Sequence, residues 1–419
     1  MTAVSLQDLI SSSRPDLKPY YDLRIHLHSH PELSQQESAT AALVAAHPAL
    51  KAYTIHPKIG GHGLAAVLEN GPGKTVLLRA DMDALPVREK TGLPYASKVT
   101  MEDNDGVTKP VMHACGHDIH VVCLLAAAEV LARTKDAWKG TLILVFQPAE
   151  ERGCGAQAMV DDGLYDRVPV PDVVLGQHVM PLRAGKIGSR VGIMMAGADS
   201  MKVTMYGRGG HASMPNRTID PVVMAAATVM RLQTVVSREV DPSGMAVVTV
   251  GSLQAGQTEN IIADRAELKV NVRTIDGETR EKVIGSIKRM VKAESDASGA
   301  EQAPVIEKSS SFPPTVNDGE VTKALQEAFS GYFGEDFDSE LPRVNGSEDY
   351  SILGTSVGKP CSFWMIGGTD PEVWDEAERK GRIIEDIPEN HSPFFAPVMK
   401  PTIQVGTDAM ALAAMTFLT

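Results

Sequence analysis

Three uninterrupted apolar runs most constrain the fold of this chain. They are TVLLRAD at residues 75–81, TLILVFQP at 141–148 and DVVLGQHV at 172–179. Strands that are covered on both faces are continuously apolar, whereas half-exposed strands alternate. A stretch rich in Ala and Leu at 120–134, which favours a helix, separates the first two runs. This order predicts an α/β sandwich with a mostly parallel sheet.

Polar side chains lie at or just beyond the end of each apolar run. Asp81 and Asp83 belong to the first run, Glu150 and Glu151 to the second, and His178 to the third. In open α/β sheets, functional groups collect beyond the carboxyl ends of the strands. We therefore predict that these side chains share one site at that edge.

The sequence pattern changes at about residue 188. Strands are expected at 199–209, 245–256, 265–276 and 303–310, and helices at 218–237 and 277–294. The β-α-β-β-α-β order predicts an inserted α+β domain of the ferredoxin-like type. We place this domain at 188–314 and the domain that carries it at 1–187 and 315–419. Residues 293–303 (AESDASGAEQA) are expected to form a solvated linker.

The segment MHACGHDIHVV, at residues 112–122, has the residue types of a metal site. Cys115 and His117 are two positions apart, and in an extended segment such residues project to the same side. Thiolate and imidazole groups suit zinc and neighbouring divalent metals. A buried cysteine beside a histidine that caps a helix is an equally open interpretation of this segment.

The pairs Glu150–Glu151 and Asp81–Asp83 strengthen the metal hypothesis. Adjacent glutamates point in different directions, so one can bind a metal while the other acts as a general base. The aspartates can bind metal or accept a hydrogen bond from a ligating imidazole. The alternatives are a solvated Glu-Glu pair and a turn capped by aspartates. The apolar strand before the glutamates favours a site.

Two further histidines are weak signals individually. His178 lies at a strand end, and His391 lies in the Ser/Pro-containing loop NHSPFF, at residues 390–395. Together with the three preceding signals, they predict a Cys/His/Glu cluster that is large enough for two metal ions. Because one contributing loop is near the C-terminus, the chain must return to the first domain after the insertion.

Successive motifs resemble those of one family. They are HPELSQQE, LLRADMDALP, MHACGHD, FQPAEE, GRGGHASMP, NIIADRAELKVNVRT, PPTVND, GSEDYS and NHSP, between about residues 30 and 395. Their order is similar to that of the amidohydrolase branch of the di-metal aminoacylase/carboxypeptidase metallopeptidases, which includes hippurate hydrolases and indoleacetyl-amino-acid hydrolases. The resemblance implies a di-metal hydrolase domain with an inserted lid domain. The implied metal ligands are Cys115, His117, Glu151, His178 and His391, with Glu150 as the catalytic base.

The resemblance also assigns roles to residues of the lid and around the metals. His211 would stabilise the oxyanion, in its own subunit or in the partner's, and Asn260 would hold a substrate oxygen. Arg273 would bind a substrate carboxylate or serve only as a cross-strand partner. Asp83 and Asp118 are expected to orient ligating histidines. The alternative for His211 is a surface histidine, and the alternative for Asn260 is a turn asparagine.

The expected activity is metal-dependent hydrolysis of the amide bond of N-acetyl or N-aroyl amino acids. The cofactors would be two divalent ions, for which Zn, Mn, Co and Ni all tolerate a Cys/His/Glu set. A metallo-dipeptidase or carboxypeptidase and a non-catalytic sensor with the same fold are the alternatives. Serine catalysis fits the Cys/His/Glu pattern poorly, and the one Gly-x-Ser-x-Gly match, GTSVG at residues 354–358, is not among the motifs above.

Composition restricts the partners. A formal net charge of -13 argues against nucleic acid and anionic membranes as partners. No apolar run approaches the roughly 20 residues of a membrane span. The four cysteines have no disulfide-framework spacing, so we expect a reducing compartment, the cytoplasm. An exposed edge strand of the lid sheet would pair two copies, which predicts a homodimer.

Overall fold

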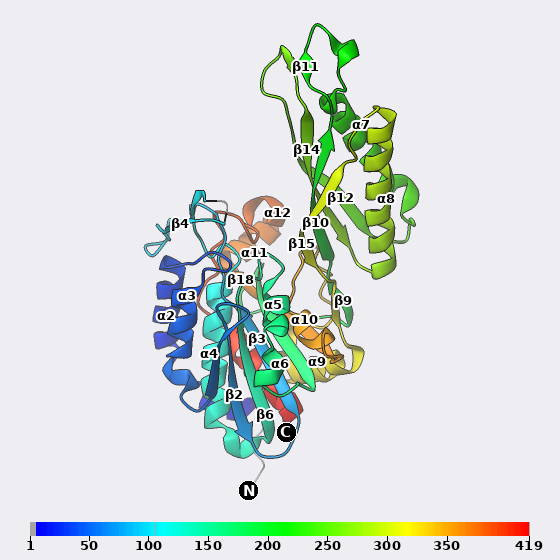
Figure 1. Ribbon diagram of the computed structural model, residues 1–419. Helices are drawn as coiled ribbons and strands as arrows, with labels where there is room; N and C mark the ends of the chain where they lie inside the picture. Colours follow the sequence, from blue (N-terminus) through cyan, green and yellow to red (C-terminus); the bar gives the residue numbers. More distant parts are fainter. Residues whose placement is uncertain (1–5, 105, 419) are drawn as a thin grey trace. The chain divides into compact units, whose positions relative to one another are not determined.

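A computed structural model describes residues 6–104 and 106–418 (Figure 1). The chain forms two compact units. The first unit comprises the described residues of Met1–Met194, Val316–Pro342 and Asp349–Thr419. The inserted unit comprises Met195–Thr315 together with Arg343–Glu348, a short segment that the sequence places in the other domain.

The first unit contains an eight-stranded sheet in the order β1-β2-β6-β3-β7-β18-β8-β17. The central strands β6, β3, β7 and β18 are parallel, and β1 and β2 extend the sheet in antiparallel fashion. This arrangement confirms the predicted, mostly parallel sheet. The strands are β1 (Thr54–Ile59), β2 (Gly63–Asn70), β3 (Thr75–Asp81), β6 (Gly140–Gln147), β7 (Val173–Arg183), β8 (Ile187–Gly188), β17 (Phe337–Asp338) and β18 (Cys361–Thr369).

Two apolar helices, α4 (His117–Arg133) and α13 (Thr402–Leu418), contact each other and the central strands. Both are buried along almost their whole length, because their sequences are apolar on all sides. The other α-helices described in this unit are α1 (Leu6–Ser13), α2 (Lys18–Ser29), α3 (Ser38–Ala45), α5 (Gly155–Asp161), α6 (Leu164–Arg167), α9 (Gly319–Phe333), α10 (Ile352–Thr355), α11 (Pro371–Lys380) and α12 (Ile383–Asp386). Short strands are β4 (Thr100–Glu102), β5 (Thr108–Pro110), β9 (Gly192–Met195) and β16 (Thr315–Asn317).

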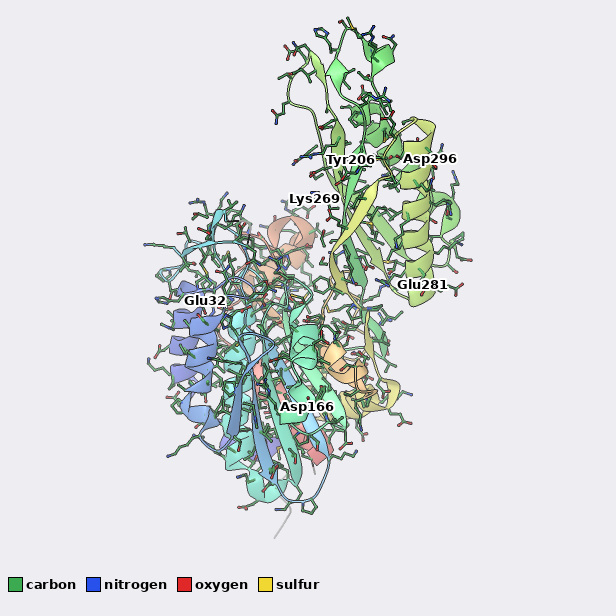
Figure 2. The ribbon with its side chains drawn as sticks, viewed as in Figure 1. Glu32, Asp166, Tyr206, Lys269, Glu281 and Asp296 are labelled. Carbon is green, nitrogen blue, oxygen red and sulfur yellow. The ribbon has the colours of Figure 1, made fainter. Side chains whose placement is uncertain are left out.

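The inserted unit is a four-stranded antiparallel sheet in the order β12-β14-β10-β15, on which two helices pack (Figures 1 and 2). Its elements are β10 (Gly197–Tyr206), α7 (Pro221–Thr234), β12 (Ala246–Ala255), β14 (Arg265–Thr274), α8 (Gly277–Ala297) and β15 (Val305–Phe312). The predicted β-α-β-β-α-β order is confirmed. A small ribbon of β11 (Gly210–His211) and β13 (Ile261–Ile262) is added to it.

The predicted linker at 293–303 is wrong over its first half. Helix α8 continues to Ala297, since Met290, Val291 and Ser295 are buried against the unit. Asp276 caps the start of this helix by accepting a hydrogen bond from the backbone N–H of Thr279 at 2.8 Å. The polar residues in the first half of the segment therefore lie mainly on the exposed side of α8.

Candidate metal centre and active site

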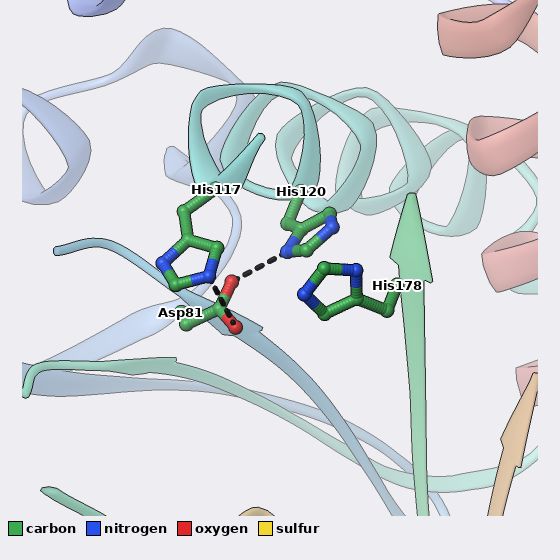
Figure 3. A group of neighbouring side chains, drawn as sticks. All are labelled: Asp81, His117, His120 and His178. Atoms are coloured by element: carbon green, nitrogen blue, oxygen red, sulfur yellow. Dashed lines mark hydrogen bonds and ion pairs between the residues drawn. The ribbon is translucent and has the colours of Figure 1, made fainter. Parts of the chain in front are cut away.

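The candidate site lies at the carboxyl edge of the central parallel strands. Strands β3, β6 and β7 are neighbours there, and α4 begins at the same edge. Gly116 allows this start, because its φ of 81° turns the chain and a Cβ would lie 2.4 Å from the side chain of Val179. The turn places His117 in the first position of α4, fully buried at the sheet edge (Figure 3).

His117 presents one ring nitrogen to the site. Its Nδ1 lies 3.2 Å from Oδ1 of Asp83, which orients the ring. Its Nε2 is 3.7 Å from Oε1 of Glu151 and 4.0 Å from Oε2 of Glu150. Asp83 therefore contacts the His117 ring at the position from which it could orient a ligating histidine.

The other predicted ligands continue this cluster on both sides. Glu151 Oε2 is 3.3 Å from Nε2 of His391, and Cys115 Sγ is 3.5 Å from Nε2 of His178. The Nδ1 of His178 is 2.8 Å from the carbonyl oxygen of Val179, which fixes the ring and leaves Nε2 facing the thiol. The structure therefore brings the predicted ligands from distant segments of the chain into one cluster.

The donor set fits divalent cations. One sulfur, one nitrogen and one oxygen of Cys115, His117 and Glu151 lie within 4.8 Å of one another. Nε2 of His117 and Oε1 of Glu151 are buried and have no hydrogen-bond partner among the described residues, although Nε2 lies 3.5 Å from Oδ2 of Asp81. A cation between Nε2 and Oε1 would satisfy both atoms. Burial opposes a charge on His117, but Asp81, Asp83 and Glu151 raise its pKa to about 10. The surrounding carboxylates thus favour positive charge at this point.

A second group of possible ligands overlaps the first. Asp81, His117, His120 and His178 lie together (Figure 3). However, Asp81 Oδ1 accepts from Nδ1 of His120 at 2.5 Å, and Oδ2 accepts from Arg79 at 2.8 Å. Nε2 of His120 accepts from the backbone N–H of Val179 at 2.8 Å. The donor atoms of Asp81 and His120 are therefore occupied, and these two residues support the site instead of completing its ligand set.

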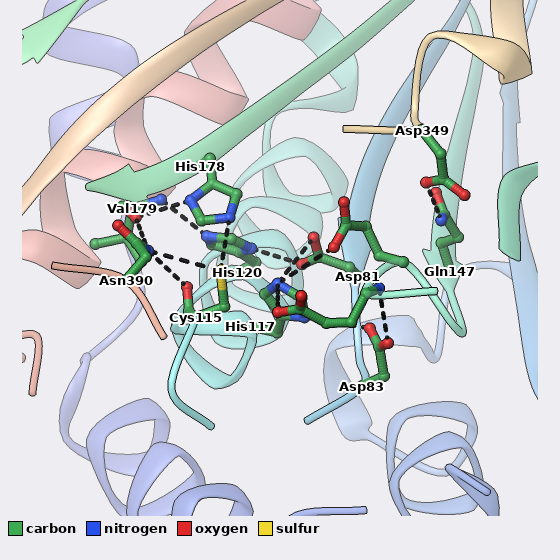
Figure 4. A network of polar contacts seen from close by, with 12 residues as sticks. Asp81, Asp83, Cys115, His117, His120, Gln147, His178, Val179, Asp349 and Asn390 are labelled. Carbon is green, nitrogen blue, oxygen red and sulfur yellow. Dashed lines mark hydrogen bonds and ion pairs between the residues drawn. The ribbon is translucent and has the colours of Figure 1, made fainter. Parts of the chain in front are cut away.

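A buried polar network connects Asp81 to Gln147 and Asp349, which lie to its right in Figure 4. Arg79 Nε donates to Gln147 Oε1 at 2.8 Å, and Gln147 Nε2 donates to Oδ1 of Asp349 at 2.6 Å. With Asp81 and His120, these residues connect four segments of the first unit. Our sequence reasoning did not identify Arg79, Gln147 or the role of His120. The sequence did offer a signal for the first two, because Arg79 and Gln147 lie in strands that are otherwise mostly apolar.

Asp118 has other partners than the predicted ligands. Its Oδ2 lies 3.0 Å from Arg24 Nε and 2.8 Å from His28 Nδ1, both on α2. Burial opposes the ionisation of Asp118, but Arg24 and His28 hold its pKa well below its ordinary value. In the structure, this carboxylate connects the start of α4 to α2.

The loop between β6 and α5 carries Glu150 and Glu151 in a tightly constrained turn. Ala149 has a φ of 50°, in the left-handed region that is unfavourable for alanine. At Gly155 a Cβ would lie 1.6 Å from the carbonyl oxygen of Pro148, so only glycine fits. This turn fixes the directions in which the two glutamates leave the sheet edge.

The predicted lid residues lie in the inserted unit. His211, on β11, is exposed, and its Nδ1 is 2.8 Å from Oγ of Ser213. Asn260 is exposed directly before β13, and its carbonyl oxygen accepts from the N–H of Ala212 at 3.1 Å. His211, predicted to stabilise the oxyanion, and Asn260, predicted to bind substrate, are therefore neighbours.

Arg273 is held within the inserted unit itself. Its Nη1 donates to the carbonyl oxygen of Asn345 at 2.9 Å and lies 3.1 Å from Oγ of Ser347. Its Nε lies 3.2 Å from Oδ1 of Asn271. These contacts explain why the segment Arg343–Glu348 belongs to the inserted unit.

The chain matches known proteins over most of its length. The sequence model of Peptidase family M20/M25/M40 matches residues 77–388. A hippurate hydrolase of Campylobacter jejuni is 41% identical over 82% of this chain and 86% of its own length. A thermostable carboxypeptidase of Saccharolobus solfataricus is 33% identical over 98% of this chain and 99% of its own length. A dinuclear metal binding peptidase from the M20 family of Bacillus subtilis has a similar structure, with a TM-score of 0.73, 28% identity, and coverage of 96% of this chain and 98% of that one.

The fold and the cluster define a metal-dependent hydrolase that acts on amide bonds. The chain belongs to the peptidase M20 family, in its amidohydrolase branch. The predicted resemblance is thus confirmed. Among the described residues, the helices are too short or too polar to cross a membrane.

Proposed function

We propose that this protein hydrolyses the amide bond of N-acyl amino acids and releases a carboxylic acid and a free amino acid. The acyl group would be acetyl or aroyl. The observation that carries the proposal is the position of Glu150, whose Oε2 is 4.0 Å from His117 Nε2 within the Cys/His/Glu cluster. The 41% identity to a hippurate hydrolase supports an N-acyl amino acid as the substrate, since hippurate is N-benzoylglycine.

We propose that the cluster holds two divalent cations, with Zn, Mn, Co and Ni as the candidates. Cys115, His117, Glu151, His178 and His391 would be the ligands. Bound divalent cations supply Lewis acidity toward an amide carbonyl and lower the pKa of water. The mixed sulfur, nitrogen and oxygen donors support this range of metals, and the dinuclear relative supports the number.

In the proposed mechanism, Glu150 removes a proton from the attacking water and then delivers it to the leaving nitrogen. Asp83 keeps His117 oriented throughout by its contact with Nδ1. His211 would donate a hydrogen bond to the carbonyl oxygen as negative charge develops there. Asn260 would hold a second substrate oxygen, and Arg273 is the candidate for the substrate carboxylate.

A carboxypeptidase or dipeptidase is the second candidate function. The 33% identity to a thermostable carboxypeptidase over nearly the whole chain favours it. A dipeptidase must meet the ammonium group of its substrate with an anionic side chain, and the lid motifs offer His211, Asn260 and Arg273 instead. These three groups suit neutral or anionic parts of a substrate better.

The deciding experiment compares two substrate series on metal-reconstituted protein. One series contains N-acetyl and N-benzoyl amino acids, and the other contains dipeptides with the same C-terminal residues. We expect the kcat/KM of the acylated series to exceed that of the dipeptides at least about tenfold, a difference of about 1.4 kcal/mol. If the protein prefers substrates with free amino termini, the dipeptidase or carboxypeptidase function replaces N-acyl amino acid hydrolysis.

We further propose a cytoplasmic homodimer that forms through the inserted unit. Strand β12 is an edge strand, and α7 exposes Val223 and Met230, which are 64% and 72% accessible. All four cysteines are unpaired thiols, which supports a reducing compartment. Light scattering of the parent and of Met230→Asp tests the assembly, and a monomeric parent would contradict it.

A further inference from the structure

We propose that Glu37 is a positioning residue that sets the direction of Glu150 by holding the backbone of its loop. Glu37 directly precedes α3 and is far from the β6–α5 loop in sequence. The inference rests on the proposed function, because Glu150 must be the base for its direction to matter. It adds a residue that touches neither the substrate nor the predicted ligands.

The Glu37 side chain is fully buried and holds two backbone groups. Its Oε1 accepts hydrogen bonds from the N–H of Gln35 and from the N–H of Ala149, each at 2.8 Å. Ala149 immediately precedes Glu150. One carboxylate oxygen therefore joins the segment before α3 to the loop that carries the proposed base.

Both donors are held in an unfavourable backbone conformation. Gln35 has a φ of 70° and Ala149 has a φ of 50°. Non-glycine residues in this region cost roughly 1–3 kcal/mol and persist only where the surroundings hold them. The shared acceptor is the side-chain contact that holds both N–H groups, and the carbonyl oxygen of Ala149 is held separately by the N–H groups of Cys154 and Gly155.

A second carboxylate holds the other side of Glu150. Asp83 Oδ2 accepts from the N–H of Glu151 at 3.0 Å and from Oγ of Ser34 at 2.6 Å. Glu37 and Asp83 thus bind the loop one residue before and one residue after Glu150. The backbone at Glu150, and with it the direction in which its Cα–Cβ bond leaves the loop, can shift only by straining or breaking one of these two contacts.

The chemistry of Glu37 also favours a positional role over a stabilising one. Its Oε2 is buried and has no hydrogen-bond partner among the described residues. A buried, partly satisfied carboxylate generally stabilises a fold less than an apolar residue of the same volume does. We therefore assign to Glu37 the role of holding the Ala149 backbone through its Oε1.

The test replaces Glu37 by methionine, which keeps the volume but removes the acceptor. Glu32 provides the matched control (labelled in Figure 2), since its carboxylate also accepts two backbone N–H groups, of Ala39 and Thr40, but in α3 instead of the loop. For Glu37→Met we expect kcat on N-benzoylglycine to fall roughly 10–100-fold, with KM changed less than about threefold. Glu32→Met should keep kcat within about threefold of the parent.

Three further readouts separate positioning from general damage. The number of metal ions per chain should be unchanged in Glu37→Met, because Asp83 still holds Glu151. Deuterium uptake of the backbone at 147–155 should rise in Glu37→Met and stay at the parent level in Glu32→Met. Glu37→Gln, whose amide oxygen can accept both N–H groups, should restore kcat to within about threefold of the parent.

Several results would overturn the proposal: kcat retained in Glu37→Met, an equal loss in Glu32→Met, or no rescue by glutamine. If Glu37→Met does not fold, Glu37→Asp takes its place, since the shorter side chain cannot reach both N–H groups. If the parent hydrolyses none of the N-acyl substrates, the proposed function fails. Deuterium uptake at 147–155 still decides whether Glu37 holds the loop.

Discussion

Most of the predicted functional residues are presented differently in the two units, although His391 of the first unit is exposed. In the first unit, Cys115, His117 and His178 are buried and lie beside the network of Asp81 and His120. In the inserted unit, His211 and its neighbour Asn260 are exposed on a ribbon of two short strands, with mainly local contacts. The first arrangement is held by buried side-chain hydrogen bonds, whereas the second relies on short-range backbone pairing.

This difference suggests a division of labour. Buried donors with fixed directions suit metal binding, because ligand geometry must be held closely. Exposed residues on a small ribbon suit groups that engage a substrate only when it is bound. Variants of the first unit should therefore separate metal binding from proton transfer, and variants of the ribbon should leave the metal content alone.

The largest expected effect belongs to Glu150→Gln. This change keeps the shape of the side chain but removes the base, so kcat should fall roughly 10²–10⁴-fold. The metal content per chain should match the parent, since Glu151 remains. Steady-state kinetics and elemental analysis on the same preparation check both points. A variant with nearly parental turnover would show that another group takes the proton.

His211→Ala tests the ribbon. The loss of a hydrogen-bond donor to the developing oxyanion should lower kcat roughly 10²–10³-fold. Because His211 belongs to the inserted unit, the metal content and the thermal stability of the first unit should not change. Ser213→Ala, which removes the hydroxyl next to His211 Nδ1, is the milder companion variant. A loss of bound metal in His211→Ala would break the proposed division.

Two core variants compare the units through packing alone. Leu124, in α4, and Ile287, in α8, are both fully buried. Truncation of either to alanine should lower the free energy of unfolding by roughly 3 kcal/mol, from lost burial and the remaining cavity. Hydrogen exchange should increase mainly within the unit that carries the change. Equal increases in both units would indicate that they unfold as one.

The smallest expected effect is that of Glu239→Gln in the inserted unit. Hydrogen bonds from Arg289 and Ser286 lower the pKa of Glu239 below its ordinary value of 4.5. A lowered carboxyl pKa contributes stability above the ordinary value, and that contribution disappears as the pH falls through the folded-state pKa. Since Arg289 is exposed and Glu239 is partly exposed, solvent screens the pair, and the loss at pH 7 should be under about 0.5 kcal/mol. Urea denaturation should show the gap between parent and variant closing toward pH 4.

Much of the fold could be predicted because its signals are local. The runs at β3, β6 and β7 are mostly apolar, and the β-α-β-β-α-β order of the inserted unit follows from alternating periodicities. The end of α8 was missed for a physical reason. Its last turn is polar on the exposed side, and only the burial of Ser295 reveals that the helix continues.

The supporting residues of the site could not be predicted in the same way. Glu37 meets Ala149, and Gln147 meets Asp349, over separations of more than a hundred residues. No periodicity encodes such pairs, because they depend on how the loops cross the sheet edge. His120 was visible as a third histidine in its segment, but only its contacts with Asp81 and Val179 reveal a support for the neighbouring ligands.

The most direct test is a crystal structure of the metal-reconstituted protein with diffraction data collected at the absorption edge of the metal. The account predicts two anomalous peaks per chain, bounded by Cys115, His117, Glu151, His178 and His391, with Glu150 beside them. Peaks bound elsewhere, or a cluster that excludes metal while amide hydrolysis continues, would contradict it.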